Sequence, residues 1–359
     1  MTTTGESRVR RLGHVPALDA FRGIAILMVL VGHMPQPALK NFGLGVDLFF
    51  VLSGFLITSL LLNEWSKDGA VSFGGFYRRR ALRLLPALML MMAVLIALTR
   101  TRAILEDAGL VFLYLSNLGA MVGHGPGVAG LGHMWSLAQE EQFYLVWPLV
   151  LSLALRPRMR PHALLYGLAC LFVGICLYRL GLSARGASSE RVWYGPDTHA
   201  DGLVIGCLAA VAYTSGAVRR IPLRTLVAAL AAGAICVLTL NSHSAWNISL
   251  VLPFFSIAAV LALLSFVLEP HSWLCRSVNH RPLRYFGRVS YGVYLWHLPL
   301  YAMLGWKLGI LVTLAVAALS YRYVEQPFLR RKRRAAPTIN QPLVDVRKSI
   351  IGNAAPASG

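Results

Sequence analysis

Long apolar runs alternate along the chain with short polar or basic segments. The runs predict helices over residues 17–35, 43–63, 134–155, 162–181, 199–215, 225–241, 248–269, 287–306 and 308–325, and one more that leads from the segment 76–86 to about Leu98. A helix needs about 20 predominantly apolar residues to cross the hydrocarbon core of a membrane. The pattern therefore predicts an all-α polytopic membrane protein, a bundle of about ten transmembrane helices.

Basic residues between the apolar runs predict how this bundle is oriented in the membrane. Arginines crowd the segments 8–11, 76–83, 156–160 and 330–334, and such clusters mark the cytoplasmic side of membrane proteins. All four clusters fall on one side only if residues 108–122 form a short interfacial or re-entrant piece instead of a crossing. Both termini are then cytoplasmic.

The same alternation divides the chain into three parts. Residues 1–16 are expected to be a cytoplasmic N-terminal segment, and residues 17–330 a transmembrane domain. Residues 331–359 are first basic and then rich in Ala, Pro, Asn and Ser, which predicts a disordered cytoplasmic tail. No repeat of fixed period and no second, soluble catalytic domain is visible.

Composition excludes two classes of protein. The chain is 56% hydrophobic and 14% charged, with a mean hydropathy of +0.60, which is not the composition of a soluble domain. A formal net charge of +19 would suit a nucleic-acid-binding protein, but the basic residues lie in short segments between apolar runs, as the positive-inside rule predicts. We therefore expect a lipid bilayer and no nucleic acid as partner. The five cysteines have no metal-binding or disulfide spacing, and no metal site is expected.

The first two predicted helices carry charge where lipid disfavours it. Asp19, Arg22 and His33 lie in the first helix, and Asp47 opens the second, although an ionised side chain at mid-bilayer costs roughly 3 kcal/mol. At ~100° and ~1.5 Å per residue, Arg22 and His33 lie within about 20° of the same helix face and ~16 Å apart along the axis. Asp19 is one turn before Arg22 and is expected to pair with it. These groups should face a protein interior or a wet cavity.

Further polar residues lie in or beside the later apolar runs: His133, Glu140, Glu141, His199, Asp201, Tyr291, Tyr294, His297 and Glu325. The polar helix entry at 139–142 indicates a water-accessible vestibule lined by carboxylates. Each residue also has a structural interpretation, because polar groups in membranes often only join helices, and Tyr or Trp stripes are typical of membrane interfaces. Nucleophile-elbow, phosphate-loop and zinc motifs are missing from the sequence. The candidates that remain are a His-based acid/base or transfer site and a proton- or ion-coupled transport path.

Several motifs together resemble those of the bacterial integral-membrane acyltransferase family three, the acyltransferase-3 O-acyltransferases. They are L-D-x-x-R-G with the R-x10-H spacing from Arg22 to His33, G-V-D-L-F-F-V-L-S-G-F-L-I at 45–57, F-Y-R-R-R-x-x-R-L-L-P at 76–86, W-S-L-x-x-E-E-Q-F-Y at 135–144, S-Y-G-V-Y-L-W-H at 290–297 and V-E-Q-P-F at 324–328. The resemblance covers about residues 15–330, nearly the whole membrane part, and the combination is highly specific.

The resemblance implies transfer of an acyl group, usually acetyl, from cytoplasmic acyl-CoA to a sugar hydroxyl in a cell-surface glycan, glycolipid or glycosylated metabolite. It implies acyl-CoA as donor substrate with no permanently bound cofactor, about ten helices, and a place in the bacterial cytoplasmic (inner) membrane. The family's functional residues correspond to Arg22, His33, Asp47, Glu140 and the basic segment Arg78–Arg83. Some members append an extracytoplasmic esterase-like domain that is not seen here, so a second acylation step is expected to need a separate glycan-assembly or acyl-transfer protein.

These residues support a mechanistic hypothesis. Transfer from a thioester to an alcohol needs a base, and imidazole suits that role near neutral pH, so His33 is the expected base. Asp47 or Glu140 would orient and polarise its ring. Arg22, tethered by Asp19, would stabilise the thioester oxygen or bind the donor's phosphates, and its distance from His33 favours donor binding. Direct transfer and a covalent acyl-histidine intermediate both stay open.

The basic segment is the expected binding site for the donor. Arg78, Arg79, Arg80 and Arg83 would bind the phosphates of CoA at the inner face, although the positive-inside rule explains the four arginines equally well.

Two other classes of function compete with this one. Buried Arg, His and Asp also build the pathways of proton-coupled secondary transporters and flippases, but the sequence shows no inverted repeat and no matched pair of broken helices. A structural scaffold for a glycan-assembly complex is the third class.

Overall fold

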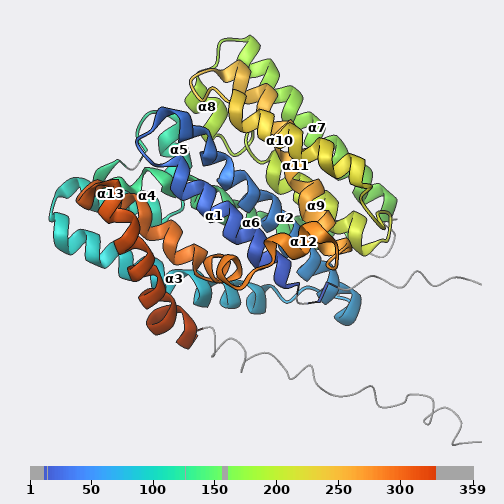
Figure 1. Ribbon diagram of the computed structural model, residues 1–359, viewed down its shortest axis with the longest axis horizontal. Coiled ribbons are helices and arrows are strands. Elements are labelled where there is room, and N and C mark those ends of the chain that lie inside the picture. Colours follow the sequence, from blue (N-terminus) through green and yellow to red (C-terminus); the bar gives the residue numbers. More distant parts are fainter. Residues whose placement is uncertain (1–11, 14, 126, 156–160, 329–359) are drawn as a thin grey trace, which may run out of the picture.

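The computed structural model describes residues 12–13, 15–125, 127–155 and 161–328. In this part of the chain 83% of the residues are helical and none is in a strand (Figure 1), which confirms the predicted all-α class. The predicted segment 1–16, the arginines of 156–160 and the predicted tail 331–359 lie largely or wholly outside the described residues. The division into three parts stays a prediction.

The helices follow the apolar runs closely. They are α1 Pro16–Gly32, α2 Gly45–Asp68, α3 Phe73–Thr99, α4 Arg102–Phe112, α5 Ser116–Met121, α6 Met134–Ala154, α7 Pro161–Ala184, α8 Ser189–Tyr194, α9 Asp201–Thr214, α10 Leu223–Thr239, α11 Ala245–Leu268, α12 Trp273–Val278 and α13 Arg281–Ser320, with short 3-10 helices η1 Pro37–Leu44 and η2 Val128–His133 and a π-helical turn η3 Tyr321–Glu325.

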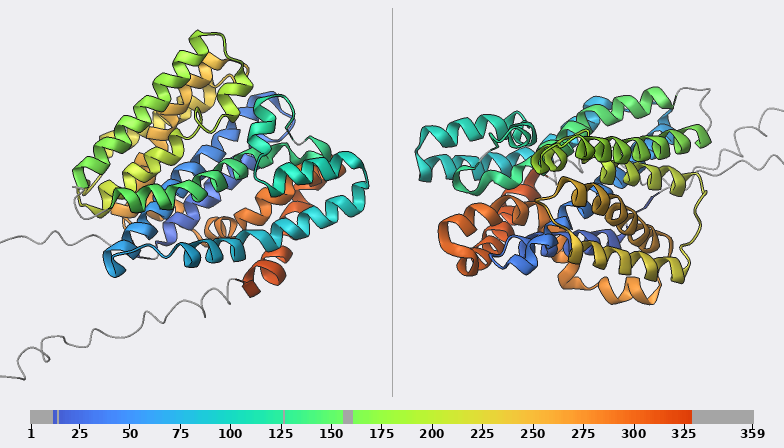
Figure 2. Two further views of the ribbon diagram at one scale, coloured as in Figure 1. Left: turned by 180° about the vertical axis from the view of Figure 1, so that it is seen from behind. Right: turned by 90° about the horizontal axis from the view of Figure 1, so that it is seen from above.

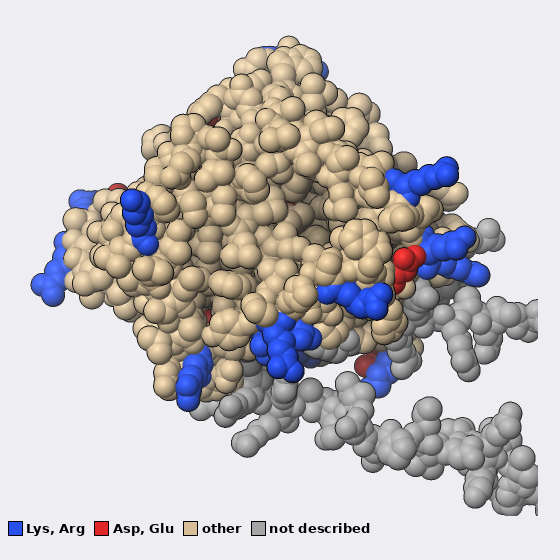
Figure 3. All heavy atoms as spheres, in the orientation of Figure 1, with Lys and Arg blue, Asp and Glu red and all other residues tan. Residues whose placement is uncertain are grey.

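Among the described residues, five helical stretches are long and apolar enough to cross a membrane: Pro37–Asp68, Phe73–Thr99, His162–Ala184, Ala245–Leu268 and Arg281–Phe328. The helices α9 and α10 are apolar but shorter. On the face drawn in Figure 3, most Lys and Arg side chains lie toward the lower edge and the sides, and the broad middle is uncharged, as expected of a surface that meets lipid. The count of ten crossings and the cytoplasmic position of both termini stay predictions.

Residues 108–122 do not form one spanning helix. The short helices α4 and α5 cover this region, and they are separated by a bend in which Tyr114 has a φ of 53°. Both are far shorter than the ~20 residues that a crossing needs. The structure therefore agrees with the expected short piece.

The predicted helices 287–306 and 308–325 form one segment that turns back on itself. α13 reverses at Gly305, whose φ of 71° and ψ of 158° lie outside the helical region and favour glycine. The two arms pack together, because Ala317 of the second arm lies against Gly292 of the first. The chain therefore forms two helical arms that meet at Gly305, close to the predicted break between residues 306 and 308.

The first two helices form the centre of the bundle. α1 packs along α13, and α2 packs along α9. Figures 1 and 2 show α7, α10 and α11 on one flank of this central pair and α4 and α13 on the other. α2 supplies buried side chains to all three apolar clusters of the core. The candidate residues of α1 and α2 are therefore enclosed by other helices on both sides.

Glycines allow the close contact between α2 and α9. A methyl group at Gly54 would lie 2.0 Å from the carbonyl oxygen of Leu203, and one at Gly206 would lie 2.2 Å from that of Val51. Residues 202–210 include two glycines and two alanines, and such small residues let membrane helices approach each other.

We expect Gly54→Ala to destabilise the protein by ~1–3 kcal/mol, because the added methyl group overlaps the α9 backbone and overpacked cores lose about this much. Gly174→Ala is the matched control. Gly174 is also within a helix, but a methyl group there meets nothing within 4 Å. Thermal unfolding of both purified variants in detergent measures the difference, and equal stability of the two would contradict the tight α2–α9 contact.

Candidate active site

A polar cavity of about 100 Å³ lies between α1, α2, α3, α6 and α13. A second cavity of about 180 Å³ adjoins it and shares the side chains of Arg22, Ser53, Arg80, Arg83 and Tyr144. Polar side chains line this space, although the surrounding helices bury mainly apolar residues. Such a space is where a membrane protein keeps charged side chains.

Two guanidinium groups line the cavity together. Arg22 from α1 and Arg83 from α3 line both cavities, and neither has a hydrogen bond or ion pair to another described residue. The expected ion pair between Asp19 and Arg22 is also absent between these two described residues. The Asp19 carboxylate attracts Arg22 only over a longer distance, so the predicted close pair does not form, and the backbone carbonyl of Asp19 packs against Gly287 of α13. Two unpaired guanidinium groups in one cavity favour binding of an anion.

The remaining arginines of the basic segment differ from one another. Arg80 lines the cavity, but its Nε donates to both Glu141 carboxylate oxygens at 2.9 and 3.0 Å. Its guanidinium also lies 3.2 Å from the centre of the Tyr144 ring. Arg79 pairs with Glu64 at 3.7 Å near the surface, and Arg78 is exposed. The structure therefore places Arg80 and Arg83, but not Arg78 or Arg79, at the cavity.

Glu140 is the carboxylate inside the cavity. It accepts a hydrogen bond of 2.5 Å from Ser53 of α2, and it lines the same space as Arg22 and Arg83. Its neighbour Glu141 binds Arg80 instead.

Three histidines from distant parts of the chain meet beyond this cavity. His33 ends α1, His133 ends η2 and His297 lies in α13. The ring centres of His33 and His297 are 5.0 Å apart, and those of His133 and His297 are 4.8 Å apart. His133 and His297 are buried, whereas His33 is half-buried. We call these three residues the histidine cluster.

All three rings of the cluster are oriented in the same way. Nδ1 of His33 contacts the carbonyl oxygen of Val29 at 2.8 Å, Nδ1 of His133 that of Gly130 at 3.0 Å, and Nδ1 of His297 that of Tyr294 at 2.6 Å. A carbonyl oxygen only accepts, so Nδ1 carries the hydrogen and Nε2 keeps its lone pair in each neutral ring.

Tyr294 connects the cavity with the histidine cluster. Its hydroxyl and that of Ser136 are hydrogen-bonded to each other, and both residues line the cavity. The Tyr294 hydroxyl also donates to the carbonyl oxygen of His133 at 2.6 Å, and its ring lies 5.1 Å from the His133 ring. Polar groups thus extend from the arginine-lined cavity to His33.

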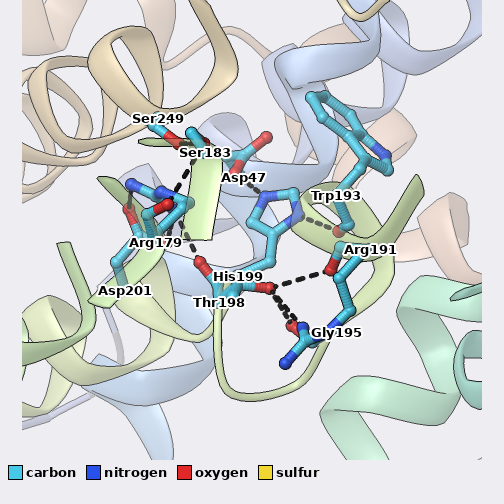
Figure 4. A network of polar contacts seen from close by, with 10 residues as sticks. All are labelled: Asp47, Arg179, Ser183, Arg191, Trp193, Gly195, Thr198, His199, Asp201 and Ser249. Atoms are coloured by element: carbon cyan, nitrogen blue, oxygen red, sulfur yellow. Dashed lines mark hydrogen bonds and ion pairs between the residues drawn. The ribbon is translucent and has the colours of Figure 1, made fainter. Parts of the chain in front are cut away.

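Neither predicted carboxylate orients His33. Asp47 is buried, and its Oδ1 is 2.8 Å from Nε2 of His199, whose Nδ1 is 2.6 Å from the carbonyl oxygen of Trp193 (Figure 4). This prediction is wrong because α2 turns its first residues toward α9, and because Nδ1 of His33 already contacts the carbonyl oxygen of Val29, which also accepts from the backbone N–H of His33. Asp47 positions His199 instead.

A second buried ion pair lies beside this one. Arg179 of α7 donates to both Asp201 carboxylate oxygens at 3.1 and 3.2 Å and to the carbonyl oxygen of Thr198 at 2.7 Å (Figure 4). Both charged side chains are completely buried. Arg179 was not among the residues singled out from the sequence, although an arginine within an apolar run is the same signal that identified Arg22.

A second arginine, Arg191, also holds the loop before α9. The Arg191 guanidinium donates to both carboxylate oxygens of Asp197, and this hydrogen bonding raises the pKa of Arg191. Arg191 also reaches the Thr198 hydroxyl at 3.4 Å. Two arginines therefore fix the loop that carries His199.

Comparison with known proteins decides the family. A family profile described as an acyltransferase domain matches residues 15–321, which include the cavity and the histidine cluster. The chain belongs to the acyltransferase-3 family. This confirms the resemblance seen in its motifs. No solved structure matches this chain significantly.

Several curated relatives of this chain are bacterial. Peptidoglycan O-acetyltransferase OatA of Listeria monocytogenes is 32% identical over 88% of this chain and 56% of its own length. YrhL of Bacillus subtilis, provisionally assigned as a peptidoglycan O-acetyltransferase, is 33% identical over 88% of this chain and 55% of its own length. A provisionally assigned O-acetyltransferase of Staphylococcus aureus is 28% identical over 93% and 60%. The chain thus spans little more than half the length of these relatives.

Proposed function

We propose that this protein is a multi-pass O-acetyltransferase of the bacterial cytoplasmic membrane that moves an acetyl group from cytoplasmic acetyl-CoA to a hydroxyl of a glycan, with peptidoglycan as the acceptor. The observation that carries the proposal is the continuous set of polar groups from the unpaired Arg22 and Arg83 through Ser136 and Tyr294 to His33. The names of the relatives support the acetyl group and the glycan.

The cavity arginines are the proposed donor site. Arg22 and Arg83 present guanidinium groups with no other partner among the described residues, and guanidinium binds phosphate through paired, charge-assisted hydrogen bonds. Arg80 is already bound to Glu141, so its role is to hold α3 against α6. The thioester would then lie toward Tyr294.

His33 is the proposed base. Its Nε2 lone pair removes the proton of the acceptor hydroxyl while the oxygen attacks the thioester carbonyl carbon. The new C–O bond forms, the C–S bond breaks, and the proton passes from His33 to the sulfur of the departing CoA. The hydrogen bond from Nδ1 to Val29 keeps the ring in the tautomer that this step requires.

A transport assay with labelled donor separates this proposal from a transporter. The purified full chain in lipid nanodiscs is given acetyl-CoA labelled in the acetyl group together with soluble glycan strands. We expect free CoA thiol and labelled glycan to appear in equal amounts, with little thiol released when glycan is omitted. An intact thioester in the presence of both substrates would reject the enzyme, and movement of glycan across the membrane without thiol release would favour the transporter or flippase.

We expect Arg22→Gln to raise the KM for acetyl-CoA by about 10–100-fold, since a charge-assisted hydrogen bond contributes ~1.5–3 kcal/mol. Arg78→Gln is the matched control, because Arg78 is exposed and does not line the cavity. Its KM should stay within about twofold of the wild-type value. Steady-state kinetics with varied acetyl-CoA measure both, and a larger effect for Arg78→Gln would move the donor site to the inner surface.

A further inference from the structure

The two buried rings of the histidine cluster have acceptor atoms that no described residue satisfies. Nε2 of His133 and Nε2 of His297 are buried and have no hydrogen-bond partner. Their Nδ1 atoms carry the hydrogens, as shown above, so each Nε2 is a bare lone pair. A buried acceptor without a donor costs about 1–3 kcal/mol. An arrangement that repeats this cost in two neighbouring rings points to a donor that is present only during the reaction.

His297 occupies the middle of the cluster. It is completely buried, and its ring makes edge-to-face contact with both His33 and His133. The other rings around it are Tyr294, at 5.5 Å, and Tyr301, at 5.9 Å. Tyr294 gives its hydrogen to the carbonyl oxygen of His133. Of these neighbours, only His33 gains a hydrogen on Nε2 in the proposed reaction.

We propose that His297 is a positioning residue whose Nε2 accepts a hydrogen bond from Nε2 of His33 once His33 has taken the acceptor's proton. This inference rests on the proposed function of His33. The imidazolium of His33 then donates through both nitrogens, Nδ1 to the carbonyl of Val29 and Nε2 to His297. The bond breaks again when the proton leaves for the sulfur of CoA, so protons and bonds balance as in the unassisted reaction.

The physical gain is stabilisation of a cation in a site of low polarity. Around His33 the described structure offers carbonyl and imidazole acceptors but no carboxylate, because Asp47 is bound to His199 and Glu140 lies in the cavity. A neutral acceptor in contact with His33 is the group that can share the new charge. His297 thereby fills the role that the sequence had suggested for Asp47 or Glu140.

Replacements of His297 separate this role from simple packing. His297→Gln places an acceptor near the position of Nε2, His297→Asn places one near Nδ1, and His297→Phe keeps a ring without either nitrogen. We expect kcat to fall about 100-fold or more in His297→Phe and His297→Asn, within the range for loss of acid–base assistance. His297→Gln should retain at least tenfold more activity than those two. The KM for acetyl-CoA should stay within about twofold throughout.

The assay uses the full chain in nanodiscs, with labelled acetyl-CoA and glycan strands, and thermal unfolding checks that each variant is folded. Wild-type activity in His297→Phe would overturn the proposal. So would an Asn variant more active than the Gln variant, because the Nδ1 contact with Tyr294 would then be the one that matters. If His297→Phe does not fold, the comparison of Gln with Asn still decides. Absence of transfer by the wild-type protein would instead reject the proposed function itself.

Discussion

His33→Ala is expected to lower kcat for acetyl transfer by about 10²–10⁴-fold, the loss typical of a missing acid–base catalyst. The acceptor hydroxyl is a weak nucleophile until its proton is removed, and His33 is the half-buried ring of the histidine cluster with its Nε2 lone pair available. The KM for acetyl-CoA should change little, because the proposed donor site at Arg22 and Arg83 is intact. Initial rates of glycan labelling at saturating acetyl-CoA measure the effect.

His124→Ala is the matched control for this variant. His124 also binds a backbone carbonyl through Nδ1, that of Val122 at 3.0 Å, but it is exposed and makes no contact with the cluster. It should keep wild-type activity. If His33→Ala retains full transfer, His33 is not the base. Rapid mixing of wild-type protein with acetyl-CoA alone distinguishes the two chemical routes, since a burst of free CoA thiol equal to the amount of enzyme indicates an acyl-enzyme and no burst indicates direct transfer.

Arg179→Ala is expected to destabilise the protein by ~3–5 kcal/mol, because it leaves the Asp201 carboxylate buried without its cation. Both side chains are completely buried, and Arg179 also holds the carbonyl of Thr198 in the loop before α9. Denaturation of the purified protein in mixed micelles, followed by loss of the folded species, measures the change. Arg102→Ala is the control, since Arg102 is 92% exposed and its pair with Glu106 should contribute less than about 1 kcal/mol.

A double replacement tests the cause of this loss. Arg179→Met combined with Asp201→Leu removes both charges together, and such swaps are often neutral or stabilising. We expect the double variant to recover most of the stability lost in Arg179→Ala. A double variant as unstable as the single one would show that the hydrogen bond to Thr198, and not the orphaned carboxylate, holds this region.

The helices could be predicted with little error. α6, for example, was expected at 134–155 and lies at Met134–Ala154, because a backbone in lipid must satisfy its hydrogen bonds within each helix. The candidate residues Arg22, Glu140 and His33 were also found, since a charge or an imidazole in an apolar run is conspicuous by itself. Partners were not. Asp19 does not pair with Arg22, and Asp47 binds His199 instead of His33, because partner choice depends on which helix faces meet.

The sequence by itself determined the helical class, the positions of the long helices, the acyltransferase-3 motifs and the shared helix face of Arg22 and His33. These are local properties, governed by hydropathy and by the helical repeat within one segment. Only the tertiary structure decided that Arg22 and Arg83 face one cavity without a hydrogen-bond partner among the described residues, and that His33, His133 and His297 meet. Such contacts join distant segments, and the way α1 packs on α13 and α2 on α9 sets them, through close approaches such as that of Gly54 to Leu203.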